Sequence, residues 1–278
     1  MKLVPLGLAL FLGGAVTCTA TVTIFEAAGA DAAAITPTRD AFRSAVGGGT
    51  VAGADGDFGG VRREINWDGV PDNGSDPNHL PADFFNTTSP RGVVFSTPGA
   101  GFLVSANSGP ATPSLFGFPT DFQPFSAQKL FTAVASNIVD LSFFLPGTMT
   151  AATTSAFGLV FVDVEVAATT SLQFFDGNNN LIFSRDALVA GNQGLSFLGG
   201  ILDAGDPQIA RVRITAGLNI ILANGVLGNP NDDVVVLDDF IYATPSAQTN
   251  DVPDSSSVVL LLGGALLALA ALQRRIAA

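Results

Sequence analysis

The sequence predicts a mainly β protein whose body is an antiparallel β-sandwich or jelly roll with one short N-terminal helix. Short apolar runs recur after Lys129, at residues 138–144, 157–166, 171–175, 181–183, 209–214 and 234–242. Turn-forming residues separate these runs, and Asp-Gly-Asn-Asn-Asn at 176–180 is typical of a hairpin turn. Glycine and proline are dense before residue 125, where long helices therefore cannot form. The 278 residues suit one large β domain once two apolar ends are set aside.

The first apolar end predicts a secretory signal. Lys2 precedes an apolar run at residues 3–16, and Cys18-Thr19-Ala20 supplies small residues before a cut after Ala20. A lipoprotein acylated at Cys18 is the alternative, although the residues before that cysteine match its usual context poorly. Cleavage would leave a mature body without cysteine, so disulfides would not stabilise it.

One helix is expected within residues 35–47. Thr36 is a candidate N-cap, Pro37 suits the first turn, and Gly47 is a stop signal. The segments before and after it carry no comparable helical pattern, so the remainder of the body is expected to form strands and turns.

The C-terminal end has the order of a membrane-sorting signal. Val252-Pro253-Asp254 and three serines precede an apolar run at 258–272, and Arg274 and Arg275 follow it. Arginines at that end would hold it in the cytoplasm and place residues 21–250 outside. This segment resembles the PEP-CTERM sorting signal in its Val-Pro-Asp-Ser variant. The resemblance implies transient anchoring in the inner membrane and processing by an exosortase in Gram-negative bacteria; an ordinary uncut single-pass anchor is the alternative.

The expected organisation is therefore a signal peptide at 1–20, a secreted domain at 21–250 and a sorting segment at 251–278. Within the body, residues 62–72, 89–99 and 238–242 look like a group of uncharacterised secreted bacterial proteins. That resemblance implies export to the cell surface or beyond, and it implies no particular chemistry.

The charge balance excludes some partners. Three of the 12 Lys and Arg lie in the terminal segments, whereas all 24 Asp and Glu lie between Glu26 and Asp254. Nucleic acid binding requires clustered basic residues, so a nucleic acid partner is not expected. Divalent cations match the acidic body better, although acidity also serves simply to keep an exported protein soluble.

Few residues could support catalysis or ligand contact. His79 is the only histidine, so a cysteine-free body excludes zinc sites of the Cys/His type. The 22 Phe against one Trp and one Tyr indicate core packing rather than a sugar-binding platform. Trp67 remains a possible ligand contact, with a partly buried core position as the alternative.

Carboxylates within apolar runs predict a structural calcium site. Asp238 and Asp239 interrupt a run that is apolar on both faces, and Asp163 does the same in residues 157–166. Adjacent strand residues point to opposite faces, so at least one of these carboxylates should be buried and in need of a partner. Ca²⁺ is one such partner, with Asp163, Asp238 and Asp239 as ligands. Salt bridges, backbone donors and exposure at strand ends are the alternatives.

The function expected from these features is that of an exported, surface-sorted, non-enzymatic structural or adhesive protein. It would associate with the cell surface or extracellular polysaccharide. A calcium-assisted carbohydrate-binding module is the alternative, and an unrecognised glycan hydrolase is the third possibility, because paired carboxylates can serve glycoside hydrolysis.

Overall fold

A computed structural model describes residues 21–106, 114–206, 208–222, 228–229 and 231–247. The predicted signal peptide, its cleavage residue Ala20 and the sorting segment with Val252, Pro253, Asp254, Arg274 and Arg275 lie outside these ranges. Within them, no helix has both the length and the apolar character needed to cross a bilayer.

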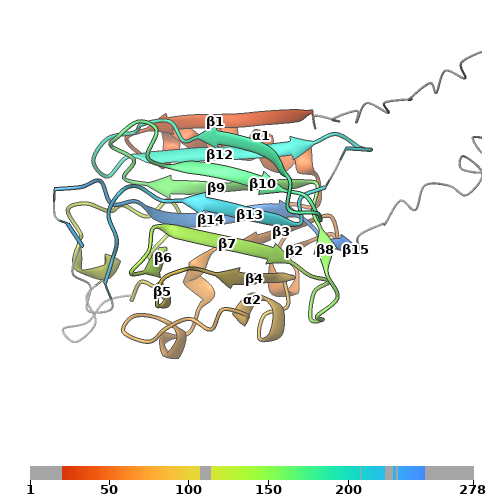
Figure 1. The fold of residues 1–278 in the computed structure, drawn as a ribbon, viewed down its shortest axis with the longest axis horizontal. Coiled ribbons are helices and arrows are strands. Elements are labelled where there is room, and N and C mark those ends of the chain that lie inside the picture. Colours follow the sequence, from red (N-terminus) through yellow and green to blue (C-terminus); the bar gives the residue numbers. More distant parts are fainter. Residues whose placement is uncertain (1–20, 107–113, 207, 223–227, 230, 248–278) are drawn as a thin grey trace, which may run out of the picture.

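The body is mainly β and its strands pair in antiparallel fashion, which confirms the predicted class (Figure 1). The larger sheet runs in the order β1 (Val22–Gly29), β12 (Leu195–Leu202), β9 (Ala156–Val162), β14 (Val236–Ala243), β3 (Arg62–Ile65) and β2 (Asp57–Phe58). Two further strands extend this sheet from β14: β6 (Phe131–Val134) pairs with β14, and β5 (Gly101–Val104) pairs with β6.

A second sheet has five strands in the order β11 (Leu181–Asp186), β10 (Ser171–Phe175), β13 (Arg211–Thr215), β7 (Ile138–Phe143) and β4 (Val93–Ser96). A small pair joins β15 (Ser246–Ala247) to β8 (Ala152–Thr153). The predicted hairpin is the β10–β11 turn, where the Asp176 carboxylate accepts bonds from Asn178 N (2.9 Å) and Asn180 N (2.8 Å).

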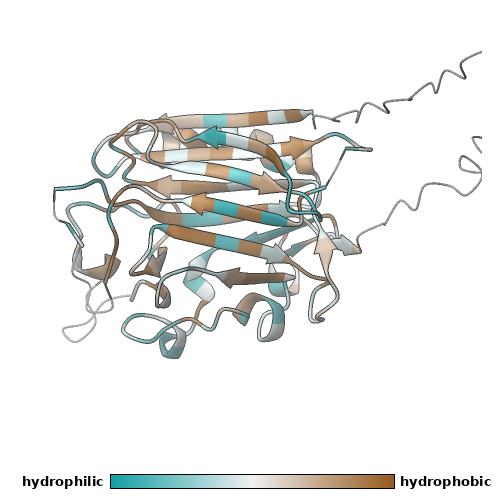
Figure 2. Ribbon diagram, viewed as in Figure 1, coloured by the Kyte–Doolittle hydropathy of each residue, from teal (hydrophilic) through white to brown (hydrophobic). Residues whose placement is uncertain are grey.

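The main core lies between the two sheets. It joins side chains of the larger sheet to those of the five-strand sheet, among them Phe157, Leu159, Phe240, Leu141, Phe174 and Val212. Apolar residues predominate in β4, β7 and β9 (Figure 2). Burial of this apolar surface is the dominant favourable contribution to folding.

The outer face of the larger sheet is covered as well, so the body has a third layer. Helix α1 (Ala32–Val46) lies against β1 and β12, and Phe116 and Phe122 from a connecting segment join the same apolar cluster. The Phe42 ring of α1 lies over Gly158 and Gly199, where an added Cβ would come within 3.1 and 2.9 Å of that ring. Both faces of β9 are therefore buried, which explains its continuous apolar sequence.

The predicted helix is present, but it begins four residues before Thr36. Asp31 is the N-cap, and its carboxylate accepts a bond from Ala34 N at 3.1 Å. Thr36 instead donates its hydroxyl to Ala32 O, and Pro37 lies inside the helix, whereas Gly47 ends it at φ 92° as expected. The expectation of a single helix also missed α2 (Phe84–Thr87) and the 3₁₀ turns at Ala54–Gly56, Trp67–Gly69, Asp72–Gly74 and Leu115–Gly117.

Candidate metal centre

Three carboxylates meet where β9 ends and β14 begins. Asp163 directly follows β9, Glu165 lies two residues further on, and Asp233 lies three residues before β14. Val162 pairs with Val236 in the antiparallel ladder. The end of β9 and the start of β14 therefore lie side by side at one end of the sheet, which is called the β9–β14 edge below. The strand register thus brings together acids that are about 70 residues apart in the sequence.

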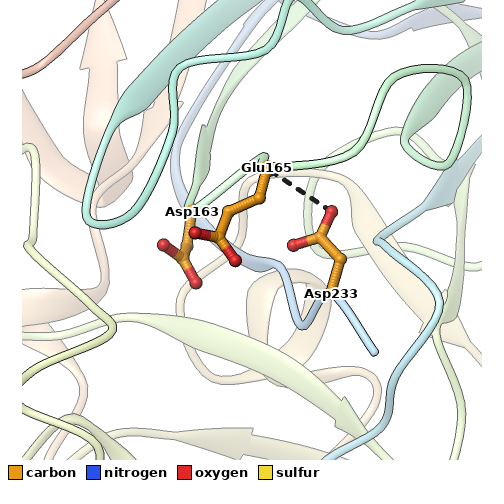
Figure 3. A group of neighbouring side chains, drawn as sticks. All are labelled: Asp163, Glu165 and Asp233. Carbon is orange, nitrogen blue, oxygen red and sulfur yellow. Dashed lines mark hydrogen bonds between the residues drawn. The ribbon is translucent and has the colours of Figure 1, made fainter. Parts of the chain in front are cut away.

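The three side chains converge on one point (Figure 3). Each offers one carboxylate oxygen, and these oxygens all lie within 4.8 Å of one another. Asp163 and Asp233 are buried, at 3% and 6% exposure, whereas Glu165 is exposed and leaves the cluster open to solvent on its side.

Backbone donors orient the two buried carboxylates. Asp163, at φ 74°, accepts a bond from Gln193 N at 2.7 Å through Oδ1. Asp233 Oδ2 accepts from Val166 N (3.1 Å), Glu165 N (3.3 Å) and the Thr169 hydroxyl (3.4 Å). Asp233 Oδ1 is buried without a hydrogen-bond partner. A buried carboxylate oxygen without a hydrogen-bond partner destabilises the folded state unless a cation lies next to it.

Burial raises the pKa of both buried carboxylates. Desolvation raises the pKa of Asp163 to about 7, and the nearby Glu165 and Asp233 charges add to the effect, although the Gln193 N–H bond opposes it. Burial likewise raises the pKa of Asp233, against the backbone donors of Val166 and Glu165. The cluster therefore gains most from a ligand that carries positive charge.

The donor set suits a hard divalent cation. Ca²⁺ takes carboxylate oxygens at about 2.3–2.6 Å in flexible geometry, so it can bridge oxygens separated by about 4.8 Å. Monodentate oxygens of Asp163 and Asp233, with one or both oxygens of exposed Glu165, could hold the ion, and water could fill the open side.

The predicted calcium set of Asp163, Asp238 and Asp239 is not brought together. In the described residues, the acidic group with metal-ligand spacing combines Asp163 with Glu165 and Asp233. Asp238 is fully buried and its Oδ2 accepts from Phe125 N (2.7 Å) and Ser126 N (3.1 Å), while Oδ1 accepts from Asp239 N (2.8 Å). Its carboxylate is therefore satisfied by backbone donors, one of the alternatives that the sequence left open.

Asp239 occupies a different setting from Asp238. The register of β14 against β9 shifts between Asp238 and Phe240, and Asp239 adopts φ 28° at this bulge. Its Oδ2 lies 3.7 Å from Arg39 Nη1, and its Oδ1 is buried without a hydrogen-bond partner. Burial raises the pKa of Asp239 to about 6, opposed first by the nearby Ser126 hydroxyl and then by the Arg43 and Arg39 charges.

Trp67 is a core residue rather than a surface contact. Its side chain is fully buried and stacks on Phe131 with ring centroids 4.1 Å apart and planes 2° apart. Phe85 and Phe240 approach it edge-on. The predicted ligand contact at Trp67 is thus replaced by the core position that the sequence offered as the alternative.

Sequence reasoning missed Asp233. The apolar run at 234–242 predicts a strand, but the acid directly before this run carries no local signal of a ligand. The available signal is non-local: a carboxylate immediately before the apolar run at 234–242 and another carboxylate within the run at 157–166. Only strand pairing shows that these two positions meet.

Comparisons with known proteins identify the C-terminal end more clearly than the body. Residues 251–276 match the VPDSG-CTERM motif, a variant of the PEP-CTERM-like sorting signal. This confirms the resemblance drawn from Val252, Pro253 and Asp254, and the motif implies export and membrane transit toward the cell surface. No curated protein matches the chain.

Among solved structures, the body is similar to the enzymatically active domain of bacteriophage CBA120 tailspike protein 4 at 13% identity and a TM-score of 0.24. The match covers 65% of this chain and 21% of the tailspike chain. The match thus spans about a fifth of the length of that solved chain.

Proposed function

We propose that this protein is an exported, surface-sorted component with a non-enzymatic structural or adhesive role at the cell surface or in extracellular polysaccharide. The VPDSG-CTERM match at residues 251–276 carries the proposal. The thick apolar core between the sheets supports it, because a body held by burial alone can function outside the cell without disulfides.

The partners follow from the sorting segment. An exosortase-type enzyme cleaves near Asp254, after the tail has held the chain transiently in the inner membrane. The secretory signal is removed after Ala20. The mature protein thus begins near Thr21, carries the described body and leaves the membrane when the tail is cut.

The proposed body includes one structural calcium ion. Asp163, Glu165 and Asp233 hold one Ca²⁺ at the β9–β14 edge, and the ion supplies the positive charge that the buried Asp233 Oδ1 lacks. Binding ties the segment after β9 to the segment before β14. The ion has a structural role and takes part in no reaction.

The sorting claim is tested by expressing the full chain and a variant ending at Asn250 in a host that carries an exosortase. Mass spectrometry of surface and extracellular fractions should find full-chain products that begin near Thr21 and end near Asp254. The shortened chain should be exported without retention at the membrane. An intact tail on all native molecules would contradict exosortase processing.

A carbohydrate-binding role is the second candidate, because a polar cleft lined by arginines and carboxylates opens beside Asp239.

A further inference from the structure

A cleft of about 600 Å³ lies between helix α1, the loop before β2, and the strands β3 and β14. This volume is within the range of small-ligand sites. Its lining alternates cationic and anionic side chains, notably Arg39, Arg43, Arg91, Asp55, Glu64 and Asp239. Basic residues are scarce in this chain, so three arginines around one cleft indicate a specific role.

Two of these charged groups have unused binding capacity. Arg91 is half-buried, donates to Glu64 O at 2.5 Å and to Ser89 Oγ at 3.3 Å, and forms no ion pair within the described ranges. Burial lowers the pKa of Arg91, and the nearby Tyr242 and Asp55 oppose this effect only in part. Asp239 has a buried Oδ1 with no partner.

Glu64 in the wall of the cleft is already paired with two arginines, of which Arg43 also lines the cleft. Arg43 Nη2 lies 2.5 Å from Glu64 Oε2, and Arg62 Nε lies 2.7 Å from Glu64 Oε1. This pairing fixes the wall between α1 and β3. The β14 bulge then turns Asp239 into the cleft lining instead of leaving it in the regular ladder.

The two unused groups together suit a ligand that is both an anion and a hydrogen-bond donor. A guanidinium binds a carboxylate through parallel N–H bonds, whereas an ionised Asp only accepts, and hydroxyl groups donate to it. We propose that this cleft binds an acidic sugar, with the sugar carboxylate at Arg91 and its hydroxyl groups at Asp239. The amide of exposed Asn66, which also lines the cleft, offers a further polar contact at the rim.

The inference rests on the proposed function, since export brings the cleft into contact with extracellular polysaccharide. The two can fail separately. Absence of sugar binding would leave the sorting result intact, and failed sorting would not change an affinity measured with purified protein.

Calorimetric titration of the purified full-length protein with trigalacturonic acid, in calcium-free buffer, tests the inference. Neutral galactotriose is the matched ligand and should bind about tenfold more weakly, because it lacks the carboxylate for Arg91. Arg91→Gln should lower the affinity for trigalacturonic acid about tenfold, while Arg185→Gln, which changes a distant exposed arginine, should leave it unchanged.

A second pair of variants tests the inference independently, in case Arg91→Gln fails to fold. Ala52 is exposed and lines the cleft, whereas Ala54 is exposed on the same loop and does not line it. Ala52→Trp should abolish binding with an unchanged melting temperature, and Ala54→Trp should bind like wild type. No binding by wild type, equal affinity for galactotriose, or unimpaired binding by Ala52→Trp would overturn the inference.

Discussion

The acids at the β9–β14 edge and those beside the β14 bulge are the same residue types in opposite electrostatic settings. At the edge, Asp163, Glu165 and Asp233 meet without a cationic side chain within salt-bridge distance in the described residues. At the bulge, Asp239 lies near Arg39 in a cleft that contains two further arginines. The first arrangement suits a cation and the second suits a ligand with both acidic and hydroxyl groups.

Asp238 is a third case, because backbone N–H groups donate to both of its carboxylate oxygens. Its carboxylate bridges to the backbone of Phe125 and Ser126, more than 110 residues away in the sequence. The comparison indicates that the neighbours of a buried carboxylate decide whether it suits a cation, a polar ligand or the protein's own backbone.

The largest expected effect is the loss of this bridge. Asp238→Ala would leave the N–H groups of Phe125 and Ser126 without an acceptor, at a cost of about 3 kcal/mol in the free energy of unfolding. Urea denaturation measures it, with Asp186→Ala on the exposed face of β11 as the control, expected within about 0.5 kcal/mol of wild type. A cost as small as that of the control would mean that the hydrogen bonds of Asp238 do not stabilise the fold.

The second prediction concerns calcium and the edge cluster. Calcium at a hundredfold above its Kd should raise the free energy of unfolding of wild type by about 2.7 kcal/mol, because it binds the folded state only. Thermal melts with calcium, magnesium and chelator measure it. Magnesium should do less, since it requires a tight octahedral shell and dehydrates reluctantly. Identical melts after exhaustive chelation would argue against the ion.

The third prediction is a pH dependence of the metal-free protein. The pKa of Asp163 is raised to about 7 when folded, so the folded state holds this proton more tightly than the unfolded chain. Its contribution to stability is present near pH 4 and is lost as the pH rises toward 7. Melting in chelator should therefore occur at a higher temperature at pH 5 than at pH 8.

Asp163→Asn serves as the control for this pH effect, because it removes the titrating group while keeping its shape. The variant should show a smaller difference between pH 5 and pH 8. Calcium should reduce the difference in wild type, since metal binding needs the deprotonated carboxylate. A wild type that melts at a higher temperature at pH 8 in chelator would contradict the assignment.

The smallest expected effect is at an exposed ion pair far from both sites. Arg185 Nη2 lies 2.6 Å from Glu26 Oε1 on the surface, where solvent screens the attraction. Arg185→Gln should leave the free energy of unfolding close to the wild-type value, as measured in urea. A cost comparable to that of Asp238→Ala would mean that surface charges, rather than buried ones, dominate in this acidic body.

Local chemistry made much of the fold predictable. The Asp176 hairpin, the apolar runs of the strands and the Gly47 helix stop depend on residues close in sequence, and each is found in the structure. The helix start was misplaced because Asp31 caps as effectively as Thr36, and nothing local decides between them.

The sites were less predictable because they depend on pairing between distant segments. The strand expected over 157–166 ends at Val162, where Asp163 turns into a left-handed conformation. That turn moves Asp163 and Glu165 out of the ladder and toward Asp233. The β9–β14 register and the bulge at Asp239 depend on tertiary structure. They separate Asp163 from Asp238 and Asp239, which the sequence predicts as one calcium site.

The most direct test of this account is a calcium titration of the full-length protein carrying either Asp233→Asn or Asp239→Asn. Both substitutions neutralise one buried carboxylate without changing its size. Asp233→Asn should abolish the wild-type calcium binding, whereas Asp239→Asn should retain it with one ion per chain. Loss of calcium binding in Asp239→Asn together with retention in Asp233→Asn would contradict the placement of the ion at the β9–β14 edge.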